Sequence, residues 1–113
     1  MTTKIHVEVF IAARLLAQRT DGFSVDDLRR EVEVKFGDTR SGVTTHISAH
    51  CVANAPRNAA TVSNYLWRLP SGELRPFDSG RDRPHPSRVD ARTTPDRRDV
   101  PAVYHHLLSY ETT

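Results

Sequence analysis

The chain has 113 residues, the length of one small domain, and a formal net charge of +2. Hydrophobic residues make up 37%, below the usual share, so we expect part of the chain not to be packed. One cysteine excludes an internal disulfide and any zinc site built from several cysteines. The start does not resemble a signal peptide, because Glu8 lies within its apolar stretch, and no run is long enough to span a membrane. We therefore expect a cytoplasmic protein with no membrane association.

The first two predicted elements are helices. Residues 4–18 have apolar side chains at helical spacing, although the alternation at their start is also typical of a strand. Residues 24–36 form a clearer helix, because Ser24 and Asp27 have the spacing of a capping box and Gly37 can end it. The apolar face of this second helix comprises Val25, Leu28, Val32 and Phe36.

A third helix is predicted within residues 41–58. Thr39 or Ser41 could cap its start, and the segment 54–56 (Asn-Ala-Pro) ends it because proline disfavours helix in the residue before it. The apolar face comprises Val43, Ile47 and Cys51. The residues that face away from it are Thr44, Thr45 and Ser48, with His46 at the margin.

Residues 65–77 predict a β-hairpin, because apolar residues alternate and the Pro-Ser-Gly at 70–72 suits a type I turn with a glycine bulge. Residues 78–99 hold six arginines, five aspartates and few apolar residues, which predicts an extended tail or disordered linker. Residues 100–113 predict a short amphipathic helix. Its apolar side would comprise Val103, Leu107 and Tyr110.

Three helices and a hairpin are the element order of a winged helix-turn-helix with the hairpin as its wing. The predicted class is therefore mainly α with a small β-hairpin (α+β). We expect a winged-helix domain at 1–77, an Arg/Asp/Pro-rich tail at 78–99 and a short helix at 100–113. The predicted second helix carries four acidic residues, whereas no acid lies between Thr39 and Ala60. This asymmetry is expected of a third helix that lies near DNA phosphates.

The predicted function is sequence-reading binding of double-stranded DNA, by a transcription regulator or by the reading module of a defence or modification system. The third helix would enter the major groove, and arginines around it would hold the backbone. A homodimer, formed through the first helix or the tail helix, would suit a two-fold operator. The predicted DNA-binding residues are Arg40, Ser41, Thr44, Thr45, His46, Ser48, Arg57, Arg68 and Arg75.

The segments VTTHISAHCVANAP and YLWRLPSGELRPFDSGRD resemble a family of small, mostly uncharacterised prokaryotic winged-helix modules, over residues 22–82. That family has a threonine-initiated third helix, a Cys-x-Asn-Ala-Pro-like end and an aromatic hairpin closing on an aromatic-Asp segment. Its modules occur alone or beside DNA-modifying and restriction-type domains. The resemblance implies an exposed face of Thr44, Thr45 and Ser48, with Cys51 and Asn54 structural. Ala53 is an extra residue relative to the family pattern.

Three other functions are possible. In a winged-helix protein-interaction module, the same surface would meet an acidic partner instead of DNA. His46, His50 and Cys51 have a zinc-like spacing, but a structural site needs four ligands and the other histidines are distant in sequence. An enzyme using Cys51 would need an orienting group and an oxyanion hole, and no motif supplies them. We therefore expect no metal, no cofactor and no enzymatic activity, with Cys51 buried.

Overall fold

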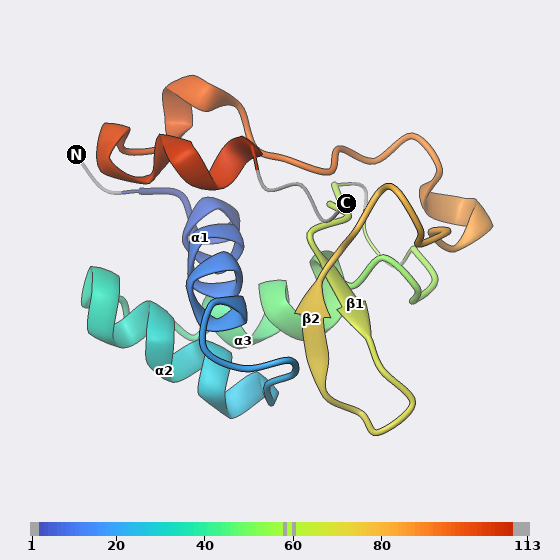
Figure 1. The fold of residues 1–113 in the computed structure, drawn as a ribbon, viewed down its shortest axis with the longest axis horizontal. Helices are drawn as coiled ribbons and strands as arrows, with labels where there is room; N and C mark the ends of the chain where they lie inside the picture. Colours follow the sequence, from blue (N-terminus) through green and yellow to red (C-terminus); the bar gives the residue numbers. More distant parts are fainter. Residues whose placement is uncertain (1–2, 58, 60, 110–113) are drawn as a thin grey trace.

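Helix α1 (Ile5–Ala17) runs through the middle of the fold in the computed structural model, which describes residues 3–57, 59 and 61–109 (Figure 1). Nine of its 13 residues are buried, including Val7, Phe10 and Leu16. A helix covered on almost every side is apolar all round. This is why its sequence shows alternation as well as a helical stripe. It also leaves little of α1 for the predicted contact between two copies.

Helix α2 (Val25–Phe36) packs against α1 and has the predicted capping box. The Ser24 hydroxyl accepts from the Asp27 backbone N–H at 3.0 Å, and the Asp27 carboxylate accepts from the Ser24 N–H at 3.1 Å. Gly37 ends the helix at φ +66°, a left-handed conformation that favours glycine. The predicted start and end of this helix are confirmed.

Helix α3 (Gly42–Thr45) continues into a π-helical turn, η1 (His46–His50). The predicted inward residues Val43, Ile47 and Cys51 are buried, but Ser41 makes no side-chain cap. The helical run ends at His50 rather than at the predicted Asn-Ala-Pro stop. It ends early because the next residues turn to meet the hairpin, where the Ala53 N–H donates to the Leu66 carbonyl at 2.7 Å.

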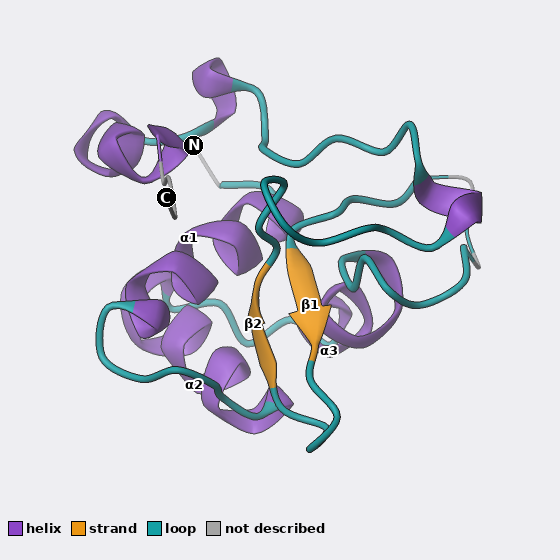
Figure 2. Cartoon of the chain, turned by 45° about the vertical axis from the view of Figure 1, so that its right-hand side comes forward, coloured by secondary structure: helices purple, strands orange, loops and turns teal. Residues whose placement is uncertain are grey.

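The predicted hairpin is confirmed as strands β1 (Leu66–Arg68) and β2 (Leu74–Pro76), which pair antiparallel with Trp67 opposite Arg75. Gly72 in the turn has φ +94°, as the predicted glycine bulge requires. Backbone bonds between Phe23 and Leu74, 2.9 and 2.7 Å long, tie β2 to the connection between α1 and α2. The described chain is therefore mainly helical, with one small antiparallel hairpin after these helices (Figure 2).

The segment after the hairpin is extended, as expected, but it packs against the rest of the chain (Figures 1 and 2). It contains three short 3₁₀ turns, η2 (Pro86–Arg88), η3 (Arg97–Asp99) and η4 (Ala102–Ser109). Arg88 is fully buried, and Val100 and Leu107 belong to the core. The predicted division at residue 77 therefore does not separate a body from a free tail.

The C-terminal helix differs from its predicted form. Val103 is 71% exposed whereas Leu107 is 3% exposed, so the two do not share a face. The cause is the 3₁₀ geometry, since at three residues per turn positions i and i+4 lie about 120° apart. Tyr110, the third residue of the predicted face, lies outside the described residues. Across the described part of the chain, no helix combines the length and apolar character needed to cross a membrane.

Candidate nucleic-acid interface

The outward face of α3 and η1 carries the three hydroxyl side chains expected there. Thr44, Thr45 and Ser48 are exposed, and so is Ser41 just before the helix. The Ser48 hydroxyl donates to the Thr44 carbonyl at 2.9 Å, so its oxygen lone pairs remain for an outside donor. A face with hydroxyl groups and no charge can both donate to and accept from a hydrogen-bonding partner.

His46 lies half-buried at the edge of this face. Its Nδ1 is 2.9 Å from the Gly42 carbonyl and must donate to it, because a carbonyl has no hydrogen to give. The neutral ring therefore presents Nε2 as an acceptor. The His46 and His50 rings meet edge to face at 4.7 Å, and burial, followed by the His46 charge, lowers the pKa of His50. Within the residues described, no group of three or more His, Cys, Asp or Glu could hold a metal ion.

Cys51 is fully buried beneath this helix, as the sequence predicted. Burial raises the pKa of its thiol to about 12. A thiol is a nucleophile only as the thiolate. The position of Cys51 is therefore that of a small apolar core residue.

Arg40 lies at the start of α3, where a phosphate contact was predicted, but carboxylates already hold it. Its guanidinium donates to Asp38 at 2.9 and 2.6 Å, and lies 3.6 Å from a carboxylate oxygen of Glu8. Both carboxylates are almost completely buried. A DNA phosphate would have to compete with Asp38 for this arginine, so the arrangement disfavours Arg40 as a contact.

Glu8, Asp38 and Arg40 together bring two buried carboxyl groups to one guanidinium. Burial, together with the neighbouring Asp38, raises the pKa of Glu8 to about 8. The hydrogen bonds from Arg40 hold the pKa of Asp38 well below its usual range. One oxygen of Glu8 is buried and has no hydrogen-bond partner within the described chain. A proton on Glu8 would let the carboxyl group donate a hydrogen bond to Asp38. At neutral pH, Glu8 therefore carries a proton, and the negative charge of Asp38 neutralises the positive charge of Arg40.

This cluster predicts a loss of stability at alkaline pH. The pKa of Glu8 is raised on folding, so its contribution is fully present below about pH 4.5 and is lost as pH rises toward about 8. Glu8→Gln should remove this part of the decline in the free energy of unfolding, measured by urea titration at several pH values. All other ionisable groups are common to both proteins, so the difference between them isolates Glu8. Glu33→Gln on the exposed side of α2 is the control, and an unchanged slope in Glu8→Gln would contradict the assignment.

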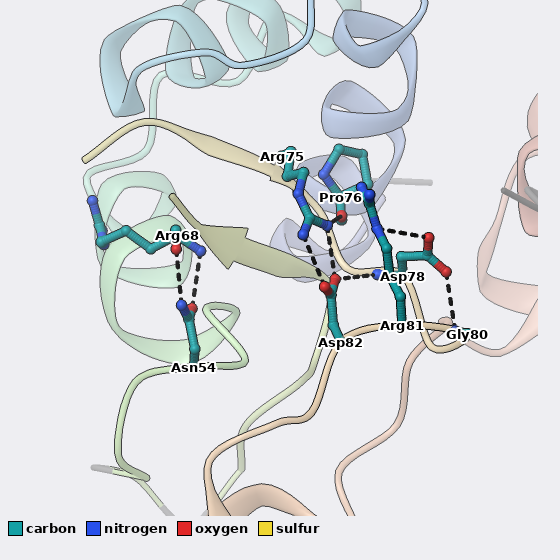
Figure 3. A network of polar contacts seen from close by, with 8 residues as sticks. All are labelled: Asn54, Arg68, Arg75, Pro76, Asp78, Gly80, Arg81 and Asp82. Atoms are coloured by element: carbon teal, nitrogen blue, oxygen red, sulfur yellow. Dashed lines mark hydrogen bonds and ion pairs between the residues drawn. The ribbon is translucent and has the colours of Figure 1, made fainter. Parts of the chain in front are cut away.

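Arg75 on the hairpin is part of a buried ion pair rather than an exposed contact (Figure 3). Its two terminal nitrogens donate to the two oxygens of Asp82 at 2.7 and 2.8 Å. The side chains of Arg75 and Asp82 are only 16% and 5% exposed. Asp82 also accepts from the Asp78 N–H at 2.8 Å, so the pair fixes the turn after β2. This geometry disfavours the predicted phosphate contact of Arg75.

Arg68 and Arg57 remain available. The Asn54 side chain clamps the backbone of Arg68, donating to its carbonyl at 2.8 Å and accepting from its N–H at 2.9 Å (Figure 3). Asn54 therefore joins the end of the helical segment to the hairpin. Among the described residues, the Arg68 guanidinium bonds to the Gly72 carbonyl at 2.8 Å and forms no ion pair. Arg57 is exposed, and its backbone N–H donates to the Ser87 hydroxyl at 2.8 Å.

Arg88 supports the helix of the candidate interface from below, and the sequence patterns did not indicate this role. It is fully buried and donates four hydrogen bonds to backbone carbonyls. Two of these carbonyls, Ala49 and His50, are at the C-terminal end of η1, where carbonyl groups have no partner inside the helix. Burial lowers the pKa of Arg88, but guanidinium groups stay charged in proteins. The tail thus supplies the C-terminal cap of the outward-facing helix.

The charge around this helix is one-sided. From Thr39 to Gly72 the chain contains no acidic residue, which is longer than the acid-free stretch noted above. Three of the four acids of α2, Asp26, Asp27 and Glu33, lie in exposed pairs with arginines of the same helix, whereas Glu31 is buried and pairs with Arg19 at 2.9 Å. The α3–η1 segment and the hairpin turn therefore present hydroxyl groups, amides and positive charge.

Comparisons with protein-family models, with curated proteins and with solved structures found no match to this chain. The resemblance to small winged-helix modules thus stays a prediction based on its sequence segments.

Proposed function

We propose that the chain binds duplex DNA as a winged-helix protein, with α3–η1 in the major groove and the hairpin as the wing. The observation that carries the proposal is the exposed hydroxyl face of Thr44, Thr45 and Ser48, within an acid-free stretch and above a buried apolar face. The core fixes the orientation of this helix, since it packs against both α1 and α2. A braced helix with uncharged polar side chains outward can approach base edges without repulsion by the phosphates.

The length of the helix determines where affinity would come from. The run from Gly42 to His50 has nine residues, which gives about 14 Å of helix. This is close to the width of the major groove, about 12 Å, so the run reaches only a few base pairs. Most of the binding free energy would then come from phosphate contacts around the helix. Arg57 and Arg68 suit this role better than Arg40 and Arg75, which carboxylates hold.

The role of such a protein would be that of a transcription regulator or of the reading module in a defence or modification system. A dimer would double the length of the site read. Since α1 is buried in its own chain, a dimer contact would have to involve other apolar positions. Within the described chain, the large apolar side chains that are most exposed are those of Val34, Val89 and Val103.

The proposal predicts salt-dependent binding of random duplex DNA, measured by fluorescence anisotropy. Affinity should fall steeply when the salt concentration rises from about 50 to about 200 mM, as expected for a protein that contacts several phosphates. Arg57→Ala should weaken binding to all sequences alike and reduce the slope of log K against log salt by about one. Arg30→Ala on the acidic helix α2, 68% exposed, is the matched control and should change neither.

The base-facing side chains should behave differently from the arginines. Replacing Thr44, Thr45 and Ser48 with alanine should change which sequences are enriched from a random pool while leaving the salt slope intact. No binding of any duplex at low salt would contradict the proposed function.

A protein-interaction module is the second candidate, and one feature favours it. A groove of about 450 Å³ lies between the end of the helical segment and the hairpin, and most of its lining is apolar. Trp67, Leu69 and Pro70 line it on the hairpin side. Grooves with such a lining accept apolar side chains of a partner. Failure to bind duplex at low salt, with binding to an acidic protein partner instead, would favour this function.

A further inference from the structure

We propose that the tail segment 83–92 belongs to the same DNA-contacting surface and contributes Arg83 near Arg57, with Arg92 further along the surface, in the pocket that Lys4 and His6 also line. This inference rests on the proposed function and adds a part of the chain that the winged-helix interpretation leaves out. It makes the packed tail a part of the binding surface rather than an appendage.

Backbone hydrogen bonds fix the tail segment against the end of the helical run. The His85 N–H donates to the Ala53 carbonyl at 2.8 Å, and Ser87 accepts from the Arg57 N–H at 2.8 Å. Further along, the Asn64 N–H donates to the Arg92 carbonyl, also at 2.8 Å. In both views, the tail and the connection before β1 lie side by side beyond the end of α3 (Figures 1 and 2).

Two buried side chains make this attachment rigid. Arg88 bonds to four carbonyls of the segment 49–63, and its own carbonyl accepts from the Asn64 side chain at 2.9 Å. Asn64 is 1% exposed. The backbone that carries the arginines of this segment is thus held in a fixed place relative to the helix, which lowers the backbone entropy lost when the segment binds.

The arginines at issue differ in their partners from most other exposed arginines. Arg57, Arg83 and Arg92 are exposed, and none forms an ion pair with any described residue. The other exposed arginines with a carboxylate within 4.0 Å are Arg19, Arg29, Arg30, Arg40, Arg81 and Arg98. Asp90 is the one acidic residue of the tail segment and is exposed, whereas Asp82 just before the segment is buried against Arg75. Guanidinium groups without an ion pair suit the phosphates of a nucleic acid backbone, although Arg92 shares its pocket with Asp99.

Their position also fits the groove. A helix about as long as the major groove is wide brings its ends close to the two flanking phosphate backbones. The N-terminal end has Arg40, which Asp38 holds. The C-terminal end has Arg57 and the tail segment, so the backbone on that side would meet the unpaired arginines.

Single and double alanine variants of Arg83 and Arg92 test the inference. Using the full chain and a random duplex, fluorescence anisotropy across a salt series should show the slope of log K against log salt reduced by about one per arginine. The loss should be the same for all sequences. Arg30→Ala is the control, because the Arg30 side chain is 68% exposed but lies on α2 beside Asp27, outside the tail segment. It should bind as the wild type does.

The outcomes separate the two proposals. If the wild type binds and Arg57→Ala weakens it, but Arg83→Ala, Arg92→Ala and their double variant bind with unchanged slope, the tail is not part of the surface and the proposed function stands. If the wild type binds no duplex at low salt, both fail. Each variant should remain folded, because the side chains of Arg57, Arg83 and Arg92 are exposed. Urea titration of each variant checks this.

Discussion

Replacing Arg88 with alanine should cost about 3–5 kcal/mol of unfolding free energy, because it removes the donor from four buried or partly buried carbonyl groups at once, although the His50 carbonyl keeps the Ser63 N–H. Arg88 is fully buried, and the carbonyls of Ala49, His50, Ala55 and Ser63 accept from it. Each buried acceptor left unsatisfied costs about 1–3 kcal/mol. Small domains are stable by only about 5–15 kcal/mol, so this variant approaches the limit of folding. Urea titration followed by Trp67 fluorescence measures the loss.

Two further variants separate the hydrogen bonds from charge and bulk. Arg88→Lys keeps the charge but offers three donors on one nitrogen, so it should fall between wild type and alanine. Arg97→Ala removes an exposed arginine from the same tail and should change stability by less than about 0.5 kcal/mol. An Arg88→Ala protein with an unchanged urea midpoint would show that the tail does not hold the helix end.

If the Arg88→Ala protein remains folded, it also tests the proposed DNA binding. The C-terminal carbonyls of η1 would lose their cap, and the last turn of the helix would loosen. Affinity should then fall although Arg88, being buried, touches no phosphate. The salt slope should change less than it does in Arg57→Ala, since no phosphate contact is removed directly.

Local signals in the sequence predicted the elements whose stabilising bonds are also local. The capping box joins Ser24 to Asp27, only three residues apart, and the hairpin turn depends on Gly72. The outward and inward faces of α3 follow from helical spacing alone, which the continuation into a π-helical turn did not overturn. Such features need no knowledge of the rest of the fold.

The features that the sequence did not reveal depend on contacts between distant residues. Arg88 bonds to carbonyls 25 to 39 positions earlier, and no spacing rule marks one arginine in an arginine-rich tail as buried. Glu8 reaches Arg40 from another helix. The low apolar content of the tail suggested that it would not pack, yet it packs mainly through hydrogen bonds to the backbone. Composition indicates how much apolar surface a segment can bury, but it does not indicate whether the segment is attached through hydrogen bonds to the backbone.

The site residues divide along the same line. Exposure of Thr44, Thr45 and Ser48 follows from periodicity, so the sequence was sufficient. Whether an arginine is available depends on its carboxylate partner, and the partner has to be known from the fold. Of the predicted backbone contacts, Arg57 and Arg68 have no ion pair within the described chain, whereas Arg40 and Arg75 do.

The Arg75–Asp82 pair gives the second large expected effect. Asp82→Ala should destabilise the chain by about 3–5 kcal/mol, because it leaves a buried guanidinium without the carboxylate that neutralises it. It also removes the acceptor of the Asp78 N–H, which fixes the turn after β2. Since Arg75 lies over the Trp67 ring at 5.7 Å, the same variant should change the fluorescence of the folded protein.

A double-mutant cycle shows whether the loss belongs to the pair. Replacing both Arg75→Met and Asp82→Leu should cost less than Asp82→Ala alone, because an apolar pair leaves no buried charge behind. Arg81→Ala serves as the surface control, since its ion pair with Asp78 at 3.1 Å involves a side chain that is 64% exposed. Additive losses in the cycle would mean that Arg75 and Asp82 act independently.

The same variants decide the role of Arg75 in binding. If Arg75 is structural, the double variant should keep the wild-type salt slope on random duplex while Arg57→Ala lowers it. If Arg75 leaves Asp82 to meet a phosphate, the double variant should lose about one unit of slope. The distances of 2.7 and 2.8 Å to Asp82, in a nearly dry environment, favour the first result, because a phosphate would have to replace two short charge-assisted bonds.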